Sequence, residues 1–104
     1  MLIVINEFSV EAGQEARFEA LFARVAELIV RESGCRRCRL HRERHASAVY
    51  VSYLEWDSEQ ALLAPHDPEI ATLIGQYPLR EPPRRRRFEI VLETDDAMRG
   101  RSPT

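Results

Sequence analysis

The 104-residue sequence has no lysine, only two cysteines and no long apolar run. No stretch approaches the roughly 18 consecutive apolar residues of a membrane-spanning helix, which excludes a membrane span. No basic segment precedes the apolar residues Met1–Ile5, so no secretory signal is visible and we expect a cytoplasmic protein. The 15 basic and 17 acidic residues give a net charge of −2, which indicates no general affinity for nucleic acid or for anionic membranes.

What is present is the composition of a globular domain, with 44% hydrophobic and 31% charged residues. A chain of this length forms one domain. It also buries roughly 65% of its extended surface, which gives a core without disulfide or metal. We therefore expect one domain over residues 1–94, followed by a polar tail over residues 95–104.

Apolar periodicity predicts four strands and two helical regions, the second of which is interrupted at Pro65. Strands are expected at residues 1–10, 37–44, 48–56 and 87–93, helices at 15–32, 58–64 and 67–77, and a turn at 45–47. Gly34 marks the end of the first helix, and Asp67-Pro68 is a typical helix start. The β-α-β-β-α-β order is typical of the ferredoxin-like α+β fold, an antiparallel four-stranded sheet with both helices on one face.

The first and third predicted strands are apolar on both faces. Ile3 and Ile5 alternate with Val4 and Phe8 in the first strand, and the third strand has the same character. Two helices cover only one face of such a sheet, and an exposed apolar face of this size favours association. A homodimer that pairs the two sheets is the simplest expectation.

Three short segments of the sequence resemble a known family. They are Ile3–Gly13, Glu32–Cys35 and Glu55–Leu62, which contain Asn6, the Glu-Ser-Gly-Cys run and the Glu-Trp-Asp-Ser run. The chain resembles the antibiotic biosynthesis monooxygenase type of dimeric α/β-barrel protein over roughly residues 1–93. The resemblance implies a homodimer that oxygenates a small aromatic phenol or quinol without metal or flavin. A non-catalytic ligand-binding or structural dimer and an isomerase of the same fold remain alternatives.

The resemblance also implies a site between sheet and helices. Asn6 matches a first-strand asparagine of the family and would hydrogen-bond a substrate oxygen. Trp56 matches a tryptophan at the end of the third strand and would form an apolar wall, with Tyr50 and Leu54 on the same strand face. His66 lies one residue beyond the family's histidine position, which Pro65 occupies here, and would act as the base. The alternatives are structural roles for Asn6 and Trp56 and a surface position for His66.

Other constellations favour no further activity. Cys35-x-x-Cys38 follows a helix and enters a strand, whereas a thioredoxin-like motif begins a helix, so we expect two reduced, partly buried thiols. RNA-binding modules of this fold need aromatic residues and glycine on the third strand, which the sequence does not supply. Residues 70–80 contain no histidine, which disfavours haem degradation.

The run Arg84–Arg87 is expected to precede the fourth strand. A solvated edge or a set of intersubunit ion pairs accounts for it more simply than an anion-binding patch. His41 and His45 lie at the end of the second predicted strand, and we expect both to be solvated.

Overall fold

The computed structural model describes residues 1–45 and 48–94. Two residues of the predicted turn, Ala46 and Ser47, and the predicted tail over residues 95–104 lie outside this part of the chain. The elements follow one another as β1 (Leu2–Ser9), α1 (Glu15–Ile29), β2 (Cys35–Arg42), β3 (Val49–Trp56), α2 (Glu59–Leu63), α3 (Pro68–Ile74) and β4 (Arg84–Glu89).

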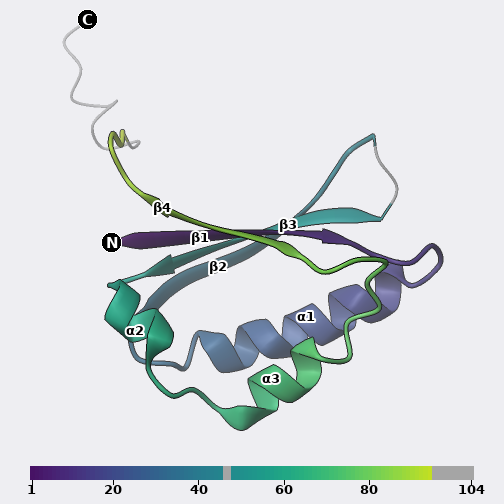
Figure 1. The fold of residues 1–104 in the computed structure, drawn as a ribbon, viewed down its shortest axis with the longest axis horizontal. Helices are drawn as coiled ribbons and strands as arrows, with labels where there is room; N and C mark the ends of the chain where they lie inside the picture. The colour runs from purple at the N-terminus through teal and green to yellow at the C-terminus, as the bar shows by residue number, and fades with distance from the viewer. Residues whose placement is uncertain (46–47, 95–104) are drawn as a thin grey trace, which may run out of the picture.

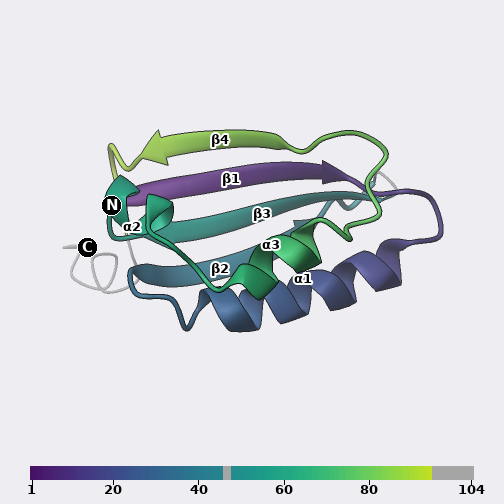
Figure 2. The same ribbon diagram turned by 60° about the horizontal axis from the view of Figure 1, so that its bottom comes forward.

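The four strands form one antiparallel sheet in the order β2-β3-β1-β4. Helices α1 and α3 lie side by side on one face of this sheet, and α2 lies near the N-terminal end of β1 (Figures 1 and 2). None of the described helices lies on the other face. This arrangement is the predicted ferredoxin-like α+β fold.

Strand β1 lies in the middle of the sheet and sets the register of the strands beside it. Asn6 of β1 stands opposite Ser52 of β3 on one side and opposite Arg85 of β4 on the other. Because side chains alternate between faces along a strand, Val4, Asn6 and Phe8 all face the helices. Polar and cationic groups from three strands therefore meet on the covered face.

The core at one end of the covered face is aromatic. Phe8, Phe18, Phe22 and Tyr50 pack together and are buried, with Tyr77 against them. Ring centroids of Phe18 and Tyr50 lie 4.8 Å apart, a distance at which aromatic pairs attract beyond simple burial. The opposite end of this face is less completely filled, and the cavity described below opens there.

Two capping residues fix the helices that close the cavity. The Ser58 hydroxyl accepts a hydrogen bond from the Ala61 N–H at the start of α2, and the Asp67 carboxylate accepts one from the Glu69 N–H at the start of α3. Between the two helices, Pro65 cannot continue α2. His66 thus lies in the short link between α2 and α3, on the helix side of the sheet.

Gly34 joins the first helical segment to β2 in a conformation that favours glycine. Its φ angle is +95°, and a Cβ atom at this position would meet the Ala61 Cβ at 2.6 Å. Helix α1 itself ends at Ile29, three residues before the predicted end, and turns span the residues up to Gly34. The predicted stop at Gly34 is thus the end of this turn.

The fourth strand differs from the prediction. It was expected at residues 87–93 after an arginine-rich connection, but it comprises Arg84–Glu89 and includes the whole arginine run. The reason is the length of its neighbour: β1 begins at Leu2, which pairs with Glu89, so residues beyond Glu89 have no strand beside them. The apolar residues Val91 and Leu92 are consequently 95% and 86% exposed.

The uncovered face of the sheet has an apolar centre and charged margins. Ile5, Val51 and Tyr53 are half-buried there, and Phe88 is 40% exposed. None of the described helices is long and apolar enough to cross a membrane.

Candidate functional site

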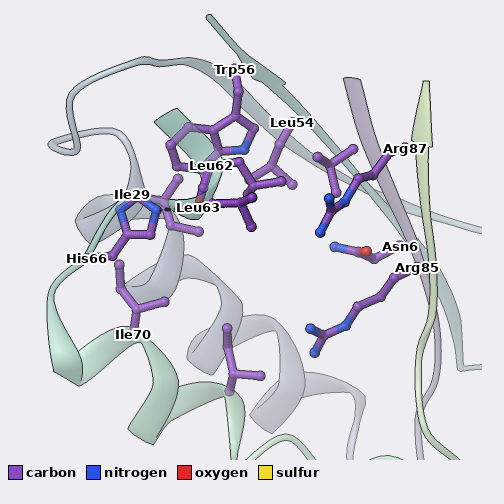
Figure 3. Close-up of a pocket in the computed structure, with 12 residues that line it drawn as sticks. Asn6, Ile29, Leu54, Trp56, Leu62, Leu63, His66, Ile70, Arg85 and Arg87 are labelled. Carbon is purple, nitrogen blue, oxygen red and sulfur yellow. Dashed lines mark hydrogen bonds between the residues drawn. The ribbon is translucent and has the colours of Figure 1, made fainter. Parts of the chain in front are cut away.

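A cavity of about 500 Å³ lies between the sheet and the helices (Figure 3). Its volume falls within the usual range of small-molecule sites. Its walls are mostly aliphatic, and five of its side chains carry nitrogen or oxygen atoms. The lining residues are Val4, Asn6, Ile29, Leu54, Trp56, Leu62, Leu63, His66, Ile70, Ile74, Arg85 and Arg87.

Asn6 projects from β1 into the cavity, between the side chains of Arg85 and Arg87 (Figure 3). Its Oδ1 atom is buried and has no hydrogen-bond partner among the described residues. Buried amide oxygens in folded proteins are almost always hydrogen-bonded to protein or water. An unsatisfied oxygen in the wall of a cavity therefore points to a ligand or a bound water as its partner.

Ser52 presents a second unsatisfied oxygen, which sequence reasoning did not single out. The residue is 0% exposed, and its Oγ has no partner within the described part of the chain. It lines a smaller cavity of about 100 Å³ that shares Asn6 and Arg85 with the larger one. Since Ser52 stands directly across from Asn6, the two unsatisfied groups belong to one polar spot on the sheet.

Trp56, the last residue of β3, is among the residues that line the cavity. It is 2% exposed, and its indole Nε1 lacks an acceptor among residues 1–45 and 48–94. The indole ring lies 5.2 Å from the imidazole ring of His66, measured between centroids. Trp56 therefore combines an apolar surface with one free hydrogen-bond donor.

His66 lines the cavity, but both of its ring nitrogens face protein acceptors. Nε2 lies 2.7 Å from the Leu62 carbonyl oxygen, and Nδ1 lies 3.4 Å from Oε2 of Glu32. Since a neutral imidazole has one N–H, the hydrogen bond to Leu62 leaves Nδ1 as the basic atom. A proton taken up at Nδ1 would sit beside the Glu32 carboxylate rather than in the cavity itself.

Glu32 was not predicted from the sequence as a site residue. Its Oε1 accepts a hydrogen bond from the Asp67 N–H at 2.9 Å. That bond, together with the contact to His66, lowers the pKa of Glu32 below its ordinary value of 4.5. Glu32 therefore stays ionised beside His66 and ties the α2–α3 link to the end of α1.

Two arginines complete the site, and neither was predicted as a site residue. Arg85 was expected in the connection before the fourth strand, and Arg87 at the start of that strand. Arg85 and Arg87 share the cavity face of β4, whereas Arg84 and Arg86 lie on the uncovered face beside Glu7. Arg87 Nη1 lies 3.2 Å from Glu59 Oε1. No carboxylate among the described residues lies within 4 Å of the Arg85 guanidinium, and none lines the cavity.

The remaining predicted residues, Leu54 and Tyr50, fall on different sides of the cavity boundary. Leu54 lines the cavity. Tyr50 is not among the lining residues; it packs in the aromatic core, where its hydroxyl donates a 2.6 Å hydrogen bond to Glu19. Burial and that bond raise the pKa of Tyr50 to about 12.

The two cysteines are free thiols that face the helices beside the apolar cluster of Leu54 and Trp56. Both are half-buried. Burial raises the pKa of Cys35 and raises that of Cys38 to about 11, which makes both thiols weak nucleophiles. No group of three His, Cys, Asp or Glu side chains within residues 1–45 and 48–94 is arranged to hold a metal ion.

Comparison with known proteins places this fold and cavity in a family. The family model described as antibiotic biosynthesis monooxygenase matches residues 1–67, which is more than half of the chain. The chain therefore belongs to the antibiotic biosynthesis monooxygenase family, as the short segments of the sequence implied. Comparison with curated protein sequences gave no match.

Solved structures agree with this assignment. SnoaB from Streptomyces nogalater, described as a cofactor-independent oxygenase, is 29% identical with a TM-score of 0.72, over 88% of this chain and 94% of that one. A Bordetella bronchiseptica protein that carries the family's name is 25% identical with a TM-score of 0.77, over 88% and 97%. Rv0793 from Mycobacterium tuberculosis, 20% identical with a TM-score of 0.79 over 90% and 98%, shows the same fold.

Proposed function

We propose that this protein is a monooxygenase that acts, without cofactor, on a small aromatic phenol or quinol bound between the sheet and the helices. The observation that carries the proposal is the apolar cavity of about 500 Å³ into which the amide of Asn6, the indole of Trp56 and the guanidinium of Arg85 all converge. Family membership and the likeness to SnoaB support the same chemistry.

The chemistry requires little of the protein beyond binding, desolvation and removal of a proton. An electron-rich phenolate reduces O2 directly. When a ring methylene becomes a carbonyl, one oxygen atom of O2 enters the product and the other leaves as water with the two methylene hydrogens. The substrate thus supplies all four electrons. Donors aimed at the phenolate oxygen stabilise the anion from which the electrons leave.

Each residue of the site has a part in this scheme. The Asn6 amide hydrogen-bonds the substrate oxygen, and the indole of Trp56 and the side chain of Leu54 form the walls against the ring. His66 is the base, with the proton held at Nδ1 against Glu32. Because Nδ1 faces Glu32, the proton reaches it through a bound water or a turn of the ring. Tyr50, outside the cavity, has no part in it.

Oxygen uptake with a panel of hydroquinones and anthrones tests the proposal. The purified protein should consume O2 faster than the uncatalysed reaction with at least one member. His66→Gln should lower kcat, whereas His41→Gln, a change at an exposed histidine of β2, should leave it unchanged. Absence of turnover for every member, with an intact fold, would favour the ligand-binding dimer or the isomerase instead.

The uncovered sheet face supports the homodimer that the sequence suggested. Ile5, Val51 and Tyr53 form an apolar centre, and charged residues of both signs surround it, among them Glu7 and Arg86. A two-fold interface pairs such a patch with itself and sets its charged margins against one another. A single monomeric species at micromolar concentration in sedimentation velocity would contradict this part of the proposal.

A further inference from the structure

We infer that the substrate of this site carries a carboxylate, which binds Arg85 at the mouth of the cavity while the aromatic ring lies inside against Trp56. The inference deepens the proposed function and rests on it for the identity of the ring. It adds a second polar group to the ligand and names Arg85 as the residue that selects for it.

The charge of the cavity is the first observation behind this inference. The two permanently charged side chains that line it, Arg85 and Arg87, are both cationic, and no Asp or Glu of the described chain is among the lining residues. A neutral phenol would bring no negative charge to balance these two guanidiniums. Electrostatic complementarity at a mostly apolar site favours an anionic ligand.

Arg87 provides an internal comparison for Arg85. Both lie on the same face of β4, two residues apart, and their side chains extend into the cavity on either side of Asn6 (Figure 3). The guanidinium of Arg87 has a partner, since its Nη1 lies 3.2 Å from Glu59 Oε1. Arg85 has no carboxylate within 4 Å in the described part of the chain. Of the two guanidiniums, that of Arg85 is therefore the one with no protein carboxylate to compete with an anionic ligand.

The position of Arg85 fixes the orientation of the ligand. It belongs to the edge strand and is exposed to solvent, while it lines both the larger and the smaller cavity. Trp56 and the leucines of α2 lie across the cavity from it (Figure 3). An amphipathic molecule would place its charged end at Arg85 and its ring toward Trp56, so that the charge stays hydrated and the ring is buried.

A carboxylate fits this site better than a phosphate. The planar guanidinium binds a carboxylate through two parallel hydrogen bonds. A phosphate group of nearly two negative charges needs a larger set of donors, and the cavity lining has no glycine among its residues. One guanidinium without a carboxylate partner matches a single negative charge.

Calorimetric titration under anaerobic conditions tests the inference without turnover. The three probes are 1-hydroxy-2-naphthoate, the corresponding 1-hydroxy-2-naphthamide and 1-naphthyl phosphate. We expect the naphthoate to bind wild-type protein about 10-fold more tightly than the amide, in line with one charge-assisted contact at a partly hydrated site. The advantage should shrink as salt is raised.

Substitutions of neighbouring arginines in β4 show whether the preference depends on Arg85. Arg85→Gln should remove the preference for the naphthoate and leave binding of the amide unchanged. Arg84→Gln, one residue earlier on the opposite face of β4, should change neither affinity. Arg85→Lys should retain part of the preference, because the charge remains and the paired geometry is lost. Circular dichroism verifies that each variant is folded.

Several results would overturn the inference. They are equal affinities for naphthoate and naphthamide, an Arg85→Gln variant that keeps the preference, no measurable binding of the naphthoate, and an Arg85-dependent preference for the phosphate. The proposed function fails in a different way. If the naphthoate binds through Arg85 but no phenol of the oxygen-uptake panel is oxidised, the binding site stands and the oxygenase assignment does not.

Discussion

At the scale of single residues, the unsatisfied polar atoms on the sheet connect this structure to its chemistry. Asn6 Oδ1, Ser52 Oγ and Trp56 Nε1 are buried without protein partners in the described chain, and all three belong to residues that line the large or the small cavity. Each such group lowers stability unless water or a ligand satisfies it. The protein thus retains groups that a purely structural core would replace with methyl groups.

The first prediction concerns Asn6. Asn6→Leu has a similar shape and removes an unsatisfied oxygen, so the free energy of unfolding should stay the same or rise by about 1 kcal/mol. Oxygen uptake should fall at least about 10-fold, because the group that holds the substrate oxygen is gone. Chemical denaturation and an oxygen electrode measure the two effects. Loss of about 2 kcal/mol or more would instead identify Asn6 as a structural amide.

The second prediction concerns Glu32 and pH. The folded protein lowers the pKa of this carboxyl, so the ionised group stabilises the fold above its ordinary value of 4.5. That contribution disappears as the pH falls through the lower pKa of the folded state. Wild type should therefore exceed Glu32→Gln in stability at neutral pH, and the two should converge in acid. Denaturant unfolding over a pH series tests this, and a difference that is constant with pH would contradict it.

At the scale of secondary-structure elements, the strands with strong apolar alternation were predictable and the charged strand was not. The alternation of β3 placed Trp56 and Leu54 on one face, where the structure has them. The β4 prediction rested on the alternation of Phe88, Ile90 and Leu92, began at residue 87 and missed the three arginines before it. Four consecutive arginines show no alternation of apolar and polar residues that would mark a strand. Their pairing with β1 makes them a strand, in which Arg84 and Arg85 lie on opposite faces of the sheet. Register against a neighbouring strand is tertiary information.

The same reasoning explains which site residues could be predicted. Asn6 and Trp56 match positions of the family, Leu54 shares the strand face of Trp56, and His66 lies one residue beyond the family's histidine position. The structure brings all four to one cavity. Tyr50 shares the strand face of Leu54 but lies further along β3, over the aromatic core. The strand face on which a residue lies therefore does not by itself decide whether that residue lines a cavity. The partners of His66 depend on how α2 packs, which no local pattern reveals.

The third prediction concerns Gly34, which lies close to Ala61 of α2. Gly13 and Gly34 both have positive φ angles, but a Cβ atom at Gly13 meets nothing within 4 Å, whereas one at Gly34 meets Ala61 at 2.6 Å. Gly13→Ala should lower the free energy of unfolding by about 1 kcal/mol, from backbone strain alone. Gly34→Ala should cost about 1–3 kcal/mol more because of the steric clash with Ala61. Equal losses of unfolding free energy for the two variants, measured by thermal or chemical denaturation, would contradict the prediction. They would show that α2 can move away from the added Cβ atom at no cost.

At the scale of the whole molecule, the helices cover the sheet face that carries the cavity and leave the opposite face of the described sheet uncovered. The fold is shared with solved structures of 20–29% identity, so the scaffold tolerates wide changes in sequence. The homodimer and the cytoplasmic location stay predictions. The identity of the natural substrate depends on the side chains that line the cavity rather than on the fold.

The fourth prediction tests the association. Val51 lies half-buried in the apolar centre of the uncovered face. Val51→Asp places a charge there and should shift the sedimentation profile from dimer to monomer at micromolar concentration, because burying an unpaired carboxylate in an interface is strongly unfavourable. Ala23→Asp, on the exposed side of α1, should give the same sedimentation profile as the wild type. Identical profiles for Val51→Asp and wild type would place the interface elsewhere.

The central claim is that this cavity transfers one atom of O2 to an aromatic phenol or quinol without a cofactor. Mass spectrometry of the product formed under ¹⁸O2 by chelator-treated protein tests it most directly. The account predicts one labelled oxygen atom per product molecule, one O2 consumed per substrate and a loss of the reaction in Asn6→Leu. An unlabelled product, or a labelled one formed equally fast by folded Asn6→Leu, would contradict it.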